Sequence, residues 1–213
     1  DCACKYAYGG GAWDYRDSIC VEFVKCEAAC AFSGDVGDGF NGHATAGTDI
    51  DAKYNTCTMR ECWSHDNNDD GYSDHEFAET VVDGGLFEYN GKAGVTPSFG
   101  CGCVCKNVMS RYNHNGFYYI GAKSDSGNEG QMICFNCISI GNTHSEAAAG
   151  GFRVAGGANK IILVNCQSIN DKNGNSGTSG TRVELYNCSC KNPSVSVKTG
   201  SATFVIENGN LVE

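Results

Sequence analysis

The chain is poor in the residues and patterns that specify helical and membrane-spanning proteins. Only 2 of its 213 residues are proline, so almost every backbone N–H remains available for strand pairing. No apolar segment approaches the ~20 residues that a membrane-spanning helix needs, and no signal peptide is recognised. No apolar stripe of helical period appears. These absences exclude a helical bundle and membrane insertion through helices, and they favour an all-β fold.

Positive charge is also scarce, and it is unevenly placed. Residues 1–90 contain 18 Asp and Glu against 5 Lys and Arg, whereas residues 91–213 contain 7 against 10, for a net charge of −10. Phosphate contacts need clustered Lys and Arg, so we expect no nucleic acid partner. The acidic half fits neutral polyhydroxylated ligands or a cation site, or it keeps a glycine-rich chain soluble.

A short phrase recurs along the chain. Residues 38–43 read D-G-F-N-G-H, and 32 positions later residues 70–75 read D-G-Y-S-D-H. Weaker copies begin at Gly94, Gly116 and Gly151, so the repeated glycine returns after 32, 23, 22 and 35 residues. Self-similarity at such spacings indicates stacked structural repeats.

A second set of repeats agrees with the first. Short β-prone runs end at recurring asparagines, namely Asn107, Asn136, Asn165 and Asn187. Such runs are too short for helices and cannot bury their apolar side alone. We therefore expect a single domain over residues 1–213, an all-β, single-stranded parallel β-helix (a solenoid) with irregular loops, and a fragment of a longer protein. Each asparagine is expected to form an inward ladder with its neighbours.

The 15 cysteines leave several interpretations open. An odd number cannot pair completely within one chain, and the chain exceeds the size at which disulfides are needed. Many cysteines fall on repeating strand positions, which favours free buried thiols. Some disulfides or a metal site remain alternatives. Stacked free thiols imply folding in a reducing cytoplasm.

One acidic loop resembles part of a calcium-binding loop. Asp66, Asn68, Asp70 and Gly71 match the first half of an EF-hand loop, but position 77 is Phe77 where the closing acid is needed. The complete motif is therefore rejected, and the sequence predicts no other cofactor. A looser Ca²⁺ site using Asp66, Asn68 and Asp70 stays open, beside an Asx-rich turn that satisfies its own backbone.

Alternation along the stacked strands predicts which side chains face outward. Two outward columns follow from the repeated phrase: Asn41, Ser73, Thr96, Tyr118 and Arg153 form one, and His43, His75, Ser98, Ile120 and Ala155 form the other. Aromatic, imidazole and hydroxyl groups in rows are typical of a shallow groove for a sugar polymer. A solvated face that happens to carry two histidines is the alternative.

The segment from Asp70 to Val95 resembles the right-handed parallel β-helix superfamily. The resemblance is carried by residues 70–76 (D-G-Y-S-D-H-E), residues 84–90 (G-G-L-F-E-Y-N) and residues 94–95 (G-V). That superfamily includes pectate lyase-like enzymes, mannuronan C5-epimerases and bacteriophage tailspike or tail-associated proteins. His75 and Glu76 match the histidine and acid of the epimerase stretch G-F-D-P-H-E. In this chain Ser73 stands at the position of the catalytic Asp of the epimerases, and Asp70 stands at the position of their Tyr. Ser98 stands at the position of the second Asp, on the next turn. The resemblance therefore implies a carbohydrate-facing surface.

The pattern and the resemblance together predict a protein that binds a cell-surface polysaccharide, with or without depolymerising it by hydrolysis or elimination. The expected catalytic residues are His75 as acid/base with Asp70, Asp74 and Glu76 as partners, and Asp38 paired with Asp70. The expected substrate-binding residues are His43, Asn41, Ser73, Tyr118 and Arg153. The tailspike resemblance implies a homotrimer that acts outside the cell or on the virion. A structural solenoid without a ligand is the alternative function.

Overall fold

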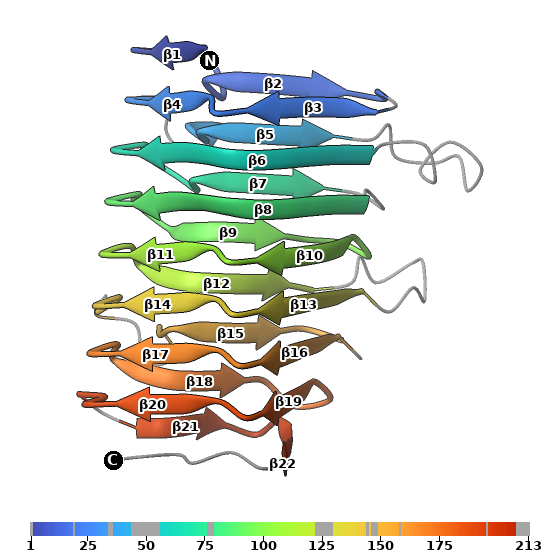
Figure 1. The fold of residues 1–213 in the computed structure, drawn as a ribbon, viewed down its shortest axis with the longest axis vertical. Helices are drawn as coiled ribbons and strands as arrows, with labels where there is room; N and C mark the ends of the chain where they lie inside the picture. The colour runs from blue at the N-terminus through green and yellow to red at the C-terminus, as the bar shows by residue number, and fades with distance from the viewer. Residues whose placement is uncertain are drawn as a thin grey trace.

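The computed structural model describes residues 2–18, 20–33, 36–43, 56–75, 79–121, 130–143, 145, 149–157, 159–194 and 196–207. The described residues form two sheets of parallel strands, and Figure 1 shows these strands stacked along one long axis from the N-terminus to the C-terminus. No helix in this part of the chain is long and apolar enough to span a bilayer. The expected all-β architecture with parallel strands is therefore confirmed.

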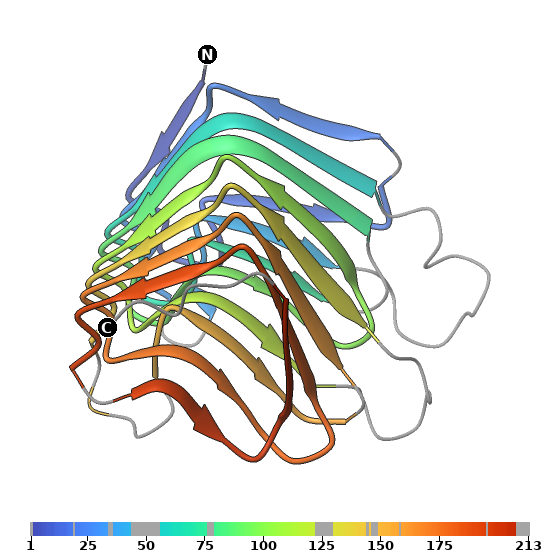
Figure 2. The same ribbon diagram turned by 60° about the horizontal axis from the view of Figure 1, so that its bottom comes forward.

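The larger sheet has 14 strands. Its members are β1 (Ala3–Lys5), β3 (Val21–Val24), β4 (Glu27–Ala29), β6 (Thr56–His65), β8 (Glu79–Glu88), β10 (Gly102–Lys106), β11 (Met109–Arg111), β13 (Gln131–Phe135), β14 (Ile138–Ile140), β16 (Lys160–Val164), β17 (Gln167–Ile169), β19 (Arg182–Tyr186), β20 (Ser189–Lys191) and β22 (Thr203–Glu207). This sheet bends along its middle, as the turned view in Figure 2 shows.

The smaller sheet has eight strands and lies opposite the bend. Its members, in spatial order, are β2 (Trp13–Arg16), β5 (Phe40–His43), β7 (Tyr72–His75), β9 (Ala93–Pro97), β12 (Asn115–Ile120), β15 (Phe152–Ala155), β18 (Asn173–Gly177) and β21 (Ser196–Gly200). Neighbours in this sheet are separated in the sequence by strands of the other sheet. The chain therefore alternates between the sheets, and each return adds a parallel strand, an arrangement compatible with a β-helix.

Residues in the left-handed region mark the bend of the larger sheet. Positive φ angles, between 51° and 69°, recur there at Lys25, Glu61, Gly84, Asn107, Asn136, Asn165 and Asn187. Asparagine tolerates this conformation better than most residues, which explains the repeated asparagine. Their amides do form a ladder: Asn136 donates to Asn107 at 3.3 Å and Asn187 donates to Asn165 at 2.7 Å. These side chains are exposed, so the prediction of an inward ladder at these positions is wrong.

A different row of side chains forms the buried ladder. We call it the inner ladder, and its members are Asn67, Asn90, Asn113, Asn142 and Asp171. The Nδ2 of Asn90 donates to Asn113 Oδ1 at 3.0 Å, and the backbone N–H of Asn113 donates to Asn142 Oδ1 at 2.8 Å. The inner ladder thus satisfies polar groups that would otherwise be buried without partners.

The inner ladder also explains the repeated glycine. Ser110 and Ser139 each lie three residues before a ladder asparagine and bond to its amide. These serines pack directly against the glycine backbone of the smaller sheet. A Cβ added at Gly116 would collide with Ser139 Oγ and would lie 2.5 Å from the carbonyl oxygen of Gly151. Glycine therefore recurs in the repeated phrase because the backbone approaches the inner ladder too closely for any side chain.

Stacked apolar side chains fill the rest of the interior. Phe117 and Phe152 stack with ring centroids 4.9 Å apart, and Phe40, Tyr72 and Tyr119 are fully buried. All 15 cysteines are free thiols, and most are buried, as the free-thiol interpretation expects. The sulfurs of this core act as small apolar groups.

We expect loss of one inner-ladder amide to destabilise the fold more than loss of an exposed one. Asn113→Ala leaves the backbone N–H of Asn90 and the carbonyl of Phe87 without their present partner, which costs about 2–3 kcal/mol. Asn136→Gly removes an exposed amide while keeping positive φ accessible, and costs less than about 1 kcal/mol. Urea unfolding of both variants measures the difference. Equal losses would contradict this role of the inner ladder.

Candidate functional site

The outer face of the smaller sheet carries the columns that alternation predicts. His43 on β5 pairs with His75 on β7, and Asn41 pairs with Ser73. Ser73 pairs in turn with Thr96 on β9, and the outward order continues through Tyr118 and Arg153, which pair between β12 and β15. The predicted register of both columns is therefore present in the structure.

These columns line a groove of 440 Å³. Its lining residues are Val36, Asp38, Asn41, His43, Asp69, Asp70, Ser73, His75, Lys92, Thr96, Ser98, Phe99, His114, Asn115, Tyr118, Ile120 and Arg153. The groove crosses β5, β7, β9, β12 and β15. Most of the expected site residues are thus brought together on one surface.

The two expected histidines lie one above the other in the groove. The rings of His43 and His75 stack with centroids 4.9 Å apart and an interplanar angle of 11°. Both ring nitrogens of His75 are engaged: Nε2 lies 2.8 Å from Ser73 Oγ, and Nδ1 lies 2.8 Å from Ser98 Oγ. His75 is thereby held in one orientation between two hydroxyl groups.

Tyr118 is the aromatic side chain in the outward column, and Arg153 lies over its ring. The guanidinium carbon of Arg153 lies 4.4 Å from the centroid of the Tyr118 ring, within the range of a cation–π interaction. This contact holds the Tyr118 ring in place. A fixed aromatic face beside hydroxyl and amide groups suits the alternating apolar and polar surfaces of a sugar ring.

Two polar atoms at the floor of the groove are buried without partners among the described residues. They are Asn41 Oδ1 and Thr96 Oγ1, on residues that are 4% and 1% exposed. Each unpartnered group costs about 1–3 kcal/mol. A hydroxyl group that reaches either atom, from water or from a ligand, would relieve this cost.

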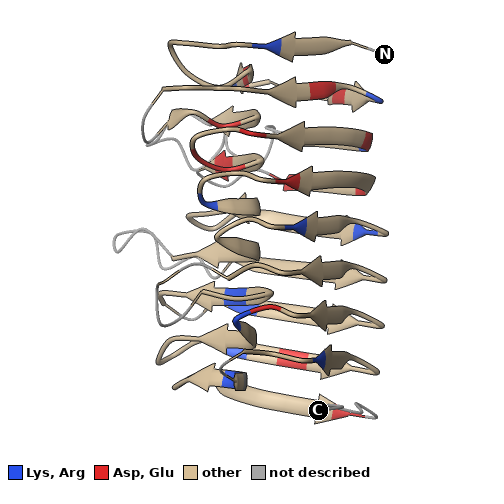
Figure 3. Cartoon of the chain, turned by 90° about the vertical axis from the view of Figure 1, so that its left-hand side faces the viewer, with Lys and Arg blue, Asp and Glu red and all other residues tan. Residues whose placement is uncertain are grey.

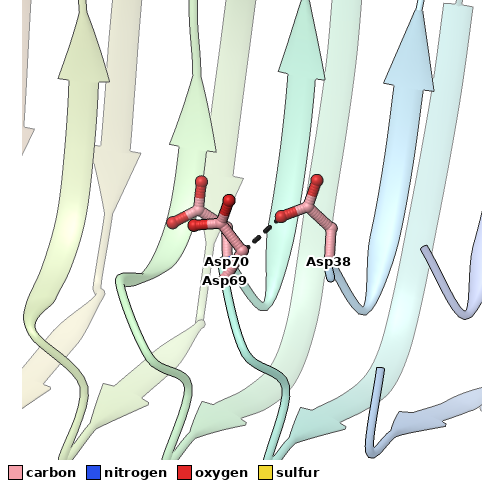
Figure 4. Close-up of side chains that lie close together, drawn as sticks. All are labelled: Asp38, Asp69 and Asp70. Atoms are coloured by element: carbon pink, nitrogen blue, oxygen red, sulfur yellow. Dashed lines mark hydrogen bonds between the residues drawn. The ribbon is translucent and has the colours of Figure 1, made fainter. Parts of the chain in front are cut away.

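An acidic wall closes one side of the groove, and Figure 4 shows its three carboxylates side by side. One carboxylate oxygen from each of Asp38, Asp69 and Asp70 lies within 4.8 Å of the other two. Asp38 Oδ1 accepts a hydrogen bond from the backbone N–H of Asp70 at 2.9 Å. Asp69 is paired with Lys92, whose Nζ lies 2.9 Å from its Oδ1. Figure 3 shows Asp and Glu more frequent in the N-terminal half of the stack than in the C-terminal half.

Burial makes the acidic wall easier to protonate. Desolvation raises the pKa of Asp38 to about 7, with a further contribution from nearby Asp69. Desolvation also raises the pKa of Asp70, and the charges of Asp38 and Asp69 raise it further. The wall therefore retains protons near neutral pH and can donate as well as accept hydrogen bonds. Asp38, Asp69 and Asp70 are also the described residues that could hold a cation.

The structure brings Asp38 and Asp70 together, as the expected pairing requires, but on one side of the groove. Asp38 and Asp70 occupy the same wall, and both hold backbone N–H groups of the next strand, with Asp70 Oδ1 accepting from Ala93 at 2.7 Å. Glycoside hydrolysis requires two carboxylates facing each other across the bond, roughly 5–10 Å apart. Both aspartates directly precede the repeated glycine, and their hydrogen bonds join successive strands. Their role in the described structure is therefore structural.

Asp74 does not reach the groove. It is 0% exposed, points into the interior, and accepts hydrogen bonds from Tyr72 Oη at 2.7 Å and Thr80 Oγ1 at 2.6 Å. Desolvation raises its pKa to about 6. The prediction of Asp74 as a partner of His75 is wrong, because alternation along β7 places the two side chains on opposite faces.

The expected calcium residues are not grouped together. Asp66 Oδ2 lies 2.7 Å from His65 Nδ1, and Asn68 is exposed, whereas Asp70 groups with Asp38 and Asp69. The acidic loop is therefore divided between different contacts. Glu76, the remaining expected catalytic acid, lies outside the described residues.

Sequence reasoning missed three groove residues with charged or titratable side chains: Asp69, Lys92 and His114. Asp69 and Lys92 are 23 positions apart, the same separation as Asn67 and Asn90 in the inner ladder. This shared separation could have predicted that Asp69 and Lys92 lie next to each other on successive turns of the chain. His114 follows Asn113 of the inner ladder by one residue.

Searches against protein-family models, curated proteins and solved structures find no match to this chain. The described fold and groove are therefore the basis for functional inference.

We expect Asp38→Asn to stabilise the protein above neutral pH. Because the pKa of Asp38 in the folded protein, about 7, lies above its ordinary value of 3.8, its protonated form contributes stability that is lost as pH rises between these values. The amide mimics the protonated acid, so the variant gains on the order of 4 kcal/mol at pH 8 and nothing below about pH 4. Urea unfolding at both pH values measures this, with the exposed Asp83→Asn as control. Lower stability of Asp38→Asn at pH 8 would contradict the account.

Proposed function

We propose that this protein is a right-handed parallel β-helix that binds a cell-surface polysaccharide in the groove on its smaller sheet. The observation that carries the proposal is the groove floor, where buried Asn41 Oδ1 and Thr96 Oγ1 lack partners among the described residues. Sugar hydroxyls donate and accept hydrogen bonds, and can therefore satisfy both atoms at once.

The remaining groove walls match the same ligand. The Tyr118 ring, held by Arg153, offers a stacking surface. The acidic wall near Asp38 offers carboxyl groups whose raised pKa lets them donate to hydroxyl oxygens. Lys92 offsets part of the negative charge of that wall through Asp69. A neutral or weakly charged sugar chain fits this mixture of groups.

The dimensions of the groove favour a polymer. Its lining residues come from β5, β7, β9, β12 and β15, and four strand spacings of about 4.8 Å span roughly 19 Å. An extended oligosaccharide can contact all five strands, whereas a single sugar cannot. The resemblance of the sequence to bacteriophage tail proteins makes a bacterial surface glycan the expected class, and a homotrimer acting outside the cell the expected assembly.

The geometry supports binding more strongly than cleavage of the polymer backbone. Asp38 and Asp70 lie on one wall, and Asp74 is in the interior, so the described acids do not face each other across the groove. A structural solenoid without a ligand remains the alternative function, and it is the outcome if no glycan binds.

We expect Tyr118→Ala to weaken glycan binding about tenfold, since one aromatic contact contributes on the order of 1 kcal/mol. An array of bacterial capsular and lipopolysaccharide glycans identifies the ligand, and titration calorimetry measures the affinity. Tyr186→Ala on the larger sheet removes an aromatic ring outside the groove and serves as the matched control. Wild-type protein that binds no glycan, or a Tyr118→Ala variant that binds as tightly, would contradict the proposal.

A further inference from the structure

Ser73, His75 and Ser98 form a continuous chain of hydrogen bonds in the groove. Ser73 Oγ lies 2.8 Å from His75 Nε2, and Ser98 Oγ lies 2.8 Å from His75 Nδ1. Ser98 Oγ also donates to the carbonyl oxygen of Asp74 at 3.0 Å. Ser73 and His75 lie on β7, and Ser98 directly follows β9. Pairing between successive strands therefore assembles a hydroxyl–imidazole–hydroxyl relay.

The Asp74 carbonyl decides which ring nitrogen carries the proton. Ser98 has one hydroxyl proton, and donating it to that carbonyl leaves its oxygen to accept from His75 Nδ1–H. Nε2 is then unprotonated and accepts the hydroxyl proton of Ser73. This is the tautomer in which all three contacts are hydrogen bonds. A serine whose proton is held by an imidazole, with the imidazole oriented by a third group, is the arrangement of an activated nucleophile.

A hydrogen-bond donor lies beside the Ser73 hydroxyl. Thr96 on β9 is a register partner of Ser73, about 4.8 Å away on the same face. Thr96 Oγ1 is buried without a partner among the described residues, so its hydroxyl is available to donate. A donor beside a nucleophile stabilises the oxyanion that forms on a carbonyl oxygen.

We propose that Ser73 is a catalytic nucleophile that hydrolyses acyl esters carried by the bound glycan, with His75 as general base and acid. Ser98 is the positioning residue, and Thr96 supplies the oxyanion contact. The choice of a glycan ester as substrate rests on the proposed function, because the same groove holds the sugar. The serine chemistry itself rests on the relay.

The reaction balances with water as the only co-reactant. Ser73 Oγ forms a bond to the ester carbonyl carbon while its proton passes to His75 Nε2. The ester C–O bond then breaks, and the sugar oxygen leaves with that proton as a free hydroxyl. Water attacks the acyl–serine, again giving a proton to His75 Nε2, which returns it to Ser73 Oγ. The products are one carboxylic acid and one sugar hydroxyl.

The decisive experiment treats the protein with a fluorophosphonate probe and maps the modified peptide by mass spectrometry. We expect Ser73 to be labelled, and p-nitrophenyl acetate to be hydrolysed. Ser73→Ala and His75→Ala are expected to lose at least ~100-fold in rate. Ser176→Ala is the matched control, since Ser176 lies in the same outward column, paired with Arg153, and is equally buried at 1% exposure. Its rate is expected to match that of the wild type.

The role of Ser98 has its own readout. Ser98→Ala is expected to lower kcat about tenfold at unchanged KM, because it removes the group that orients the imidazole, and Ser98→Thr is expected to restore the rate. Absence of labelling at Ser73 in the folded wild-type protein would overturn the inference, even where glycan binding is observed. Labelling of Ser73 in a protein that binds no glycan would support the serine chemistry and contradict the proposed glycan function.

Discussion

Register between successive strands is the constraint on which the whole structure depends. Each new strand of the smaller sheet pairs with the preceding strand of that sheet. The inner ladder determines the register of this pairing. Asn67 and Asn90 each bond to the next member through side-chain and backbone groups, and Asn113 bonds to Asn142 through its backbone N–H. A slip of one residue would break these bonds inside an interior where unpaired polar groups are costly.

The groove follows from the same register. Because like positions stack over like, the imidazoles of His43 and His75 lie face to face, and the hydroxyls of Ser73 and Ser98 meet the two nitrogens of one ring. The residues of this site lie on strands that are far apart in the sequence. Repetition converts a separation of 22 to 35 residues into a distance of one strand spacing, and a linear binding surface results.

The sequence was sufficient for the strand register and for most of the groove, because alternation and a recurring glycine determine both. It was insufficient for Asp38 and Asp70, whose carboxylates bond to the next strand's backbone instead of facing each other. It also misplaced the buried ladder. Asn107 and its successors sit at an exposed bend with positive φ, whereas Asn113, without a following cysteine, is inside. Backbone conformation at the bend, which residue identity alone leaves open, decides between these positions.

The most direct test of this account is the distance between the His43 and His75 rings in solution. With ¹³C-labelled histidine, five residues contribute signals, and stacked rings whose centroids are 4.9 Å apart predict a nuclear Overhauser effect between their ring protons. A clear cross-peak that disappears in His43→Ala is the expected result. Its absence in the folded protein, with each ring showing contacts to unrelated residues, would contradict the stacked register and the groove built on it.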